Sequence, residues 1–131
     1  MLKQITQYIK NNTTGFTIGT NLFAGFVPST AANDIVVVRE SGGATDADLV
    51  DKVEYAIQVL SRAVDYWVAR ANAIKVYDCL HCKKGITLPT VDGKAYYANV
   101  IQAITAPQNV GQDEAGLHNI STNFIIRIED V

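Results

Sequence analysis

Hydrophobic residues recur along the chain with two different periods, and the period changes from one segment to the next. Leu2, Ile5 and Ile9 lie three and four positions apart, which predicts an amphipathic helix over about residues 1–11. A run of asparagine, threonine and glycine then ends this helix. The segment 16–27 alternates instead, which predicts an extended stretch with the inward residues Phe16, Ile18, Leu22 and Phe26.

Further segments have the alternation or the β-branched composition typical of strands. Residues 34–40 are rich in valine, and the Ser-Gly-Gly that follows is expected to end this strand. A proline in 85–91 predicts an edge strand, and residues 96–104 alternate. Residues 107–116 are polar, which predicts a flexible loop. The clearest alternation is in 118–129, whose predicted buried face is Ile120, Thr122, Phe124, Ile126 and Ile128.

The segment 46–84 allows two interpretations. Its apolar residues recur at threes and fours, so periodicity alone allows one helix of almost forty residues. An average helix has only about a dozen residues. The first part of the segment is β-rich and the second part is rich in alanine. We therefore predict a strand at about 52–61, then a helix at about 63–82 with Trp67 in the core.

The predicted fold is α+β, with one mostly antiparallel sheet flanked by two helices that pack on one of its faces. A chain of 131 residues and 14.2 kDa predicts a single domain over residues 1–131. The net charge of −2 disfavours a protein that wraps nucleic acid, because such proteins neutralise many phosphates. We find neither an apolar run of transmembrane length nor a signal peptide, so we expect synthesis in a cytoplasm and no membrane association.

The segment Cys79-Leu-His81-Cys82 is the most suggestive chemical motif. A Cys-x-x-Cys pair is half of a zinc site, but structural zinc needs four ligands, and the other histidine, His118, is distant in the sequence. We expect two buried cysteines near the end of a helix, with no metal and no cofactor. Nucleotide-binding loops and nucleophile elbows are missing as well, so we do not expect an enzyme. A small metal- or thiol-dependent enzyme that uses Cys79, His81 and Cys82 stays as a distant alternative.

Three stretches follow one another in a distinctive order. They are Asn21-Leu22-Phe23-x-Gly25-x-x-Pro28, then Asp34-Ile-Val-Val-Val-Arg39-x-x-Gly42-Gly43, then Pro107-x-x-Val110-Gly111-Gln112-Asp113-Glu114-x-Gly116 followed by Asn123-Phe124. Together they resemble the tail-terminator proteins of long-tailed bacteriophages, which are also described as minor capsid or tail-completion proteins. The resemblance covers about residues 16–129. It implies an α/β domain whose sheet is flanked by two helices, and it favours a strand followed by a helix in the ambiguous segment.

The resemblance also implies a function in assembly, without an active site. A ring of usually six subunits docks on the last ring of tail-tube protein and stops the growth of the tube. It then presents a surface to the head-completion or connector proteins of the neck. Genomic DNA passes through the lumen without sequence-specific binding. The expected location is the tail-neck region of the virion, after synthesis in the cytoplasm of the host bacterium, and the alternative is another neck or head–tail joining protein.

The physical chemistry of the chain is compatible with this function. Each subunit of a ring needs two different complementary surfaces, and exposed edge strands can provide them. Mild acidity suits a channel for DNA, because a basic lumen would bind phosphates. Asp46, Asp48 and Asp51 do not match a calcium loop, because Glu54 is not at the spacing of the closing glutamate. Asp113 and Glu114 are adjacent, and adjacent carboxylates in loops are most often only solvated. If the protein forms a ring, we expect some of its acidic residues to line the lumen or to lie at the interface with the ring or the tube. These residues are Asp46, Asp48, Asp51, Asp113 and Glu114.

Overall fold

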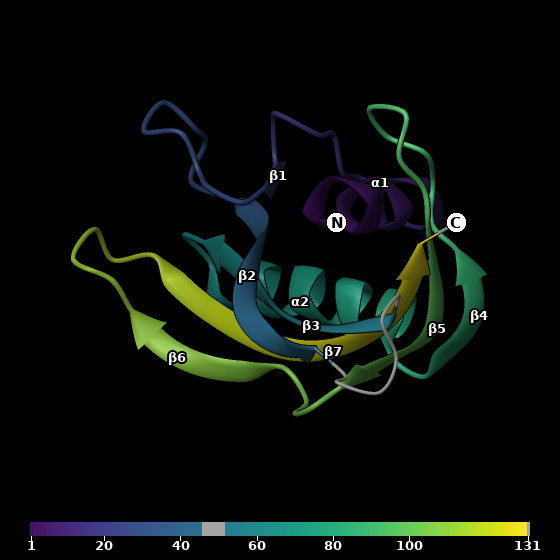
Figure 1. The fold of residues 1–131 in the computed structure, drawn as a ribbon. Coiled ribbons are helices and arrows are strands. Elements are labelled where there is room, and N and C mark those ends of the chain that lie inside the picture. Colours follow the sequence, from purple (N-terminus) through teal and green to yellow (C-terminus); the bar gives the residue numbers. More distant parts are fainter. Residues whose placement is uncertain (46–51, 131) are drawn as a thin grey trace.

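The computed structural model describes residues 1–45 and 52–130. These residues form two helices and a seven-stranded, mostly antiparallel sheet (Figure 1), which confirms the α+β prediction. The strand order is β1-β2-β3-β7-β5-β4, and β6 pairs with β7. In chain order the elements are α1 (Leu2–Asn12), β1 (Leu22–Ala24), β2 (Ile35–Thr45), β3 (Lys52–Ala63), α2 (Tyr66–Leu80), β4 (Lys83–Thr87), β5 (Tyr96–Ala103), β6 (Gln108–Gln112) and β7 (His118–Asp130).

Both helices lie inside the curve of the sheet (Figure 1). Ile9 of α1 and Leu80 of α2 are fully buried in one core cluster with Phe124 of β7. β7 is the central strand, because β3 pairs along one of its edges while β5 and β6 share the other edge. All five residues of its predicted inner face are buried, which confirms that prediction. Neither helix in the described part of the chain is long and apolar enough to cross a membrane.

The ambiguous middle segment is a strand followed by a helix, as predicted. Its strand, β3, pairs antiparallel with both β2 and β7. Its helix, α2, begins after Asp65, whose carboxylate Oδ1 accepts a hydrogen bond of 2.8 Å from the backbone N–H of Trp67. The cap explains why the helix begins later than the predicted residue 63.

The apolar run at the start of β2 is buried on both faces of the sheet. Val36 and Val38 join the core beneath the helices. Ile35 and Val37 point the other way, into a smaller cluster with Phe23 of β1. The loop between β1 and β2 covers this cluster through Val27 and Ala31. A strand that is covered on both faces reads as continuously hydrophobic, which is why this stretch does not alternate.

The expected extended stretch over residues 16–27 forms a strand only at β1, and β1 pairs parallel with β2. The reason is a loop that the Asn21 side chain closes. The side-chain Oδ1 of Asn21 accepts a hydrogen bond of 2.7 Å from the backbone N–H of Thr17, and the side-chain Nδ2 donates one of 2.8 Å to the backbone carbonyl of Gly15. These backbone groups therefore bond within the loop and do not extend a sheet ladder.

Two of the four predicted inward residues of this segment point to solvent. Phe16 and Leu22 are buried, as predicted, whereas 42% of Ile18 and 72% of Phe26 are exposed. Both exposed residues line an apolar hollow of about 300 Å³ between α1 and β1. Alternation predicts burial only where the backbone is extended, and the loop interrupts the extended conformation.

Two segments that were predicted to lie outside the sheet belong to it. β2 continues through the Ser-Gly-Gly run to Thr45, with a bulge between Glu40 and Gly42. β6 replaces the expected flexible loop and pairs antiparallel with the beginning of β7. All five residues of β6 are exposed. Backbone hydrogen bonds hold β6, and these leave no hydrophobic pattern in the sequence.

Gly85 in β4 occupies a position that requires glycine. Its φ is +64°, and a Cβ atom there would lie 3.0 Å from the hydroxyl oxygen of Tyr97. We expect Gly85→Ala to lower the free energy of unfolding by about 1–2 kcal/mol from the left-handed backbone alone, and by more if Tyr97 cannot move. Gly93→Ala is the matched control, because its φ is +76° and no atom lies within 4 Å. Urea unfolding measures both, and a smaller loss at Gly85 than at Gly93 would contradict the contact.

Candidate functional site

A hairpin made of β6 and the first residues of β7 projects at one end of the sheet (Figure 1), and we call residues 108–121 the arm. The turn at its tip is held by Asp113, whose Oδ1 accepts hydrogen bonds of 3.0 Å from the N–H groups of Ala115 and Leu117. Glu114 is exposed, and its carboxylate has no hydrogen-bond or ion-pair partner among the described residues. Asp113 therefore builds the turn, and Glu114 presents a free negative charge to the surroundings.

The structure brings together two of the five predicted site residues, Asp113 and Glu114, at the tip of the arm. The other three, Asp46, Asp48 and Asp51, lie outside the residues that the structure describes.

Three exposed apolar side chains form a patch at the beginning of α2, and we call Val64, Trp67 and Val68 the apolar patch. Their exposed fractions are 58%, 72% and 40%. The ring of Tyr66 contacts the Trp67 ring edge-on at 5.0 Å between centroids and the His118 ring at 5.7 Å. Since His118 is the first residue of β7 and pairs with Gln112 directly beside the turn, the patch adjoins the tip end of the arm. Contiguous exposed apolar surface is typical of sites that bind another protein, so this patch is a candidate interface.

The prediction that Trp67 lies in the core is wrong. α2 carries two apolar stripes, and the sheet covers the one formed by Ala69, Ala73, Val76 and Leu80. Trp67 and Ile74 belong to the second stripe, which faces away from the sheet and is exposed. A helix with apolar residues around most of its circumference needs a second covering surface. That second stripe was the signal in the sequence that could have identified the apolar patch.

The Cys-His-Cys segment does not bring its three side chains together, although Cys82 Sγ lies 3.1 Å from His81 Nε2. Cys79 is buried, but Cys82 lies beyond the end of α2, is exposed and has a φ of 58°, so the prediction of two buried cysteines is confirmed only for Cys79. His81 has a structural role, since its Nδ1 accepts a hydrogen bond of 3.1 Å from the N–H of Ala103 and its ring stacks on Tyr77. In the described part of the chain, no group of three or more His, Cys, Asp or Glu side chains is placed to hold a metal ion.

We expect iodoacetamide to alkylate Cys82 well before Cys79 in the folded protein. Burial raises the pKa of the Cys79 thiol, so less of the reactive thiolate forms there, and burial also restricts access. Peptide mass spectrometry after a short exposure at about pH 8 measures the two rates. In urea the rates should converge, and faster alkylation of Cys79 in the folded chain would contradict its burial.

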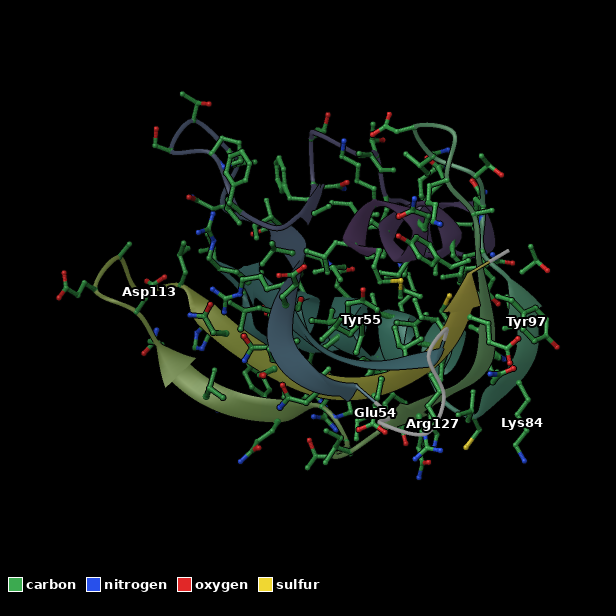
Figure 2. All side chains as sticks on the ribbon, viewed as in Figure 1. Glu54, Tyr55, Lys84, Tyr97, Asp113 and Arg127 are labelled. Carbon is green, nitrogen blue, oxygen red and sulfur yellow. The ribbon has the colours of Figure 1, made fainter. Side chains whose placement is uncertain are left out.

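The face of the sheet away from the helices carries side chains that bond to one another. Glu54 and Arg127 form an ion pair of 3.3 Å on this face (Figure 2). The guanidinium of Arg39 donates to the side chain of Gln58 at 2.8 Å, and Gln58 donates to the hydroxyl of Ser121 at 2.9 Å. Exposed pairs of this kind contribute little to stability. These groups are already partnered, so the candidate site consists of the arm and the apolar patch.

The chain was compared with known proteins. A family model with the description "Bacteriophage tail terminator protein" matches residues 8–130. No curated protein matches the chain. The matched residues include α2, β4 and the arm, so both surfaces described above lie within the matched region.

Proposed function

The chain belongs to the bacteriophage tail terminator family, and from this premise we propose that it forms a ring that caps the head-proximal end of the tail tube. The protein is a structural component of a phage tail and therefore of the virion. In this proposal the ring has six subunits, stops tube polymerisation and offers a docking surface to the head-completion proteins of the neck. DNA passes through its lumen without sequence-specific binding, and no subunit catalyses a reaction. The observation that carries the proposal is the family match over residues 8–130.

The arm and the apolar patch support a function in assembly. A ring is built from heterologous contacts, so each subunit must present two different surfaces. The arm offers an exposed strand with carboxylates at its tip, and the apolar patch offers a surface that is not covered within the subunit. We assign Asp113 and Glu114 to a ring or tube interface. On sequence alone, we propose the same role, or a position in the lumen, for Asp46, Asp48 and Asp51.

Tail length tests the capping function. We expect a phage from which the gene for this chain is deleted to assemble overlong tail tubes, because nothing stops their polymerisation. Negative-stain electron microscopy measures the tube lengths, and the gene supplied in trans should restore the normal length. Tails of normal length without heads would contradict capping and favour a neck or head–tail joining protein.

Native mass spectrometry without added metal tests the ring. We expect a species near six times 14.2 kDa, either from the purified protein alone or after addition of purified tail tubes. A monomer that carries zinc, together with loss of function in the Cys79→Ser/Cys82→Ser double variant, would contradict the structural function and favour a metal- or thiol-dependent enzyme.

A further inference from the structure

Two regions beside opposite ends of β7 carry opposite charges and unpaired strand edges. The acidic region is the tip of the arm, next to the beginning of β7, and the basic region is β4, which pairs with β5 beside the end of β7. Figure 2 shows Asp113 and Lys84 at opposite ends of the molecule. Two different surfaces at opposite ends are what a head-to-tail contact between identical subunits requires.

The arm has a defined shape, although every residue of its strand β6 is exposed. Its strand β6 pairs only with the beginning of β7, and no described strand pairs with its other edge. The tip is held by the hydrogen bonds of Asp113 and by one of 3.1 Å from the Gln112 amide to the carbonyl of Gly116. A preformed, exposed strand edge is ready to pair with a second chain, and little ordering is needed for this.

The edge of β4 has the complementary properties. β4 pairs only with β5 within the described sheet, so its outer edge is unpaired as well. It begins with Lys83 and Lys84, and no described residue forms an ion pair with either ammonium group. Asp78 lines the same shallow hollow as Lys83, whereas Lys84 is exposed and lies outside that hollow, so it is the more available cation. Lysines on an edge disfavour pairing with a basic strand, so a strand that adjoins carboxylates fits best.

We propose that the arm of one subunit lies along β4 of the next subunit, with the outer edges of β6 and β4 paired and Glu114 close to Lys84. This inference rests on the proposed ring. Each of the two strands has five residues, so their edges match in length. Because the arm also carries charge opposite to that of β4, the occupant that we propose for the β4 edge is a second copy of this chain. The contact joins the sheets of neighbouring subunits, and the charges at the tip set its register.

Charge reversal tests this contact. We expect Glu114→Lys and Lys84→Glu each to raise the protein concentration at which rings form about tenfold at low salt, because like charges then face each other. The double variant Glu114→Lys/Lys84→Glu should form rings as the wild type does. An equal mixture of the two single variants should also form rings, of alternating composition, because every contact then pairs opposite charges. Native mass spectrometry resolves this composition, and Glu40→Lys, at an exposed carboxylate of β2, is the control.

The outcomes separate this inference from the proposed function. Single variants that form rings as readily as the wild type would overturn the contact between the arm and β4 and leave the ring intact. The contact would also be overturned if ring formation were restored neither in the double variant nor in the mixture of the two single variants. A wild-type chain that forms no ring, alone or on tail tubes, and does not restore tail length would overturn both.

Discussion

Replacing Phe124 by alanine is expected to lower the free energy of unfolding by about 3–5 kcal/mol, which is a large part of the stability of a domain of this size. Phe124 is fully buried in the middle of β7. It lies in register with Ile57 of β3 on one side and Ala103 of β5 on the other. Its removal leaves a cavity where the central strand meets the helices, because the surrounding core relaxes only partly.

Urea unfolding of the isolated subunit measures this loss. Ile125→Ala is the matched control, because Ile125 is the next residue on the same strand, points to the opposite face and is only partly buried. We expect a clearly smaller loss there. A loss below about 1 kcal/mol for Phe124→Ala would contradict the position of Phe124 in the core.

Replacing Trp67 by serine is expected to weaken assembly about thirtyfold or more while the subunit stays folded. Trp67 is 72% exposed, so its loss should change the free energy of unfolding by less than about 1 kcal/mol. Buried tryptophans at interfaces commonly contribute about 2 kcal/mol or more, and each 1.4 kcal/mol corresponds to about a tenfold change in affinity. The edge contact with Tyr66 holds the ring in place before any partner binds.

Ring formation and binding to purified tail tubes are the two measurements for Trp67→Ser. Loss of the ring would place the apolar patch between copies, and an intact ring that no longer binds tubes would place it against the tube protein. Ile104→Ser is the control, because Ile104 is 56% exposed but lies outside the patch. A Trp67→Ser variant that assembles as well as the wild type in both measurements would contradict an interface role.

The candidate site could be predicted from the sequence only in part. Asp113 and Glu114 were identified as a pair of carboxylates in a polar segment, but their different roles depend on the turn geometry. The N–H groups of Ala115 and Leu117 converge on Asp113 only because the chain reverses direction there. The separation of this tip from the lysines of β4 follows from the strand pairing, because β6 pairs with the beginning of β7, whereas β5, the partner of β4, pairs with its end.

The sequence by itself determined the elements that bury one side of a regular pattern. α1 and β7 are examples, because a period of about 3.6 or of two places the residues of the pattern on one face, and burial of that face decides the conformation. The tertiary structure decided what has no such pattern. β6 is held by backbone hydrogen bonds, which residues of almost any type can make. Cys82 is exposed because α2 ends before it. Trp67 faces solvent because only one of two apolar stripes can contact the sheet, and that choice depends on how the whole helix packs.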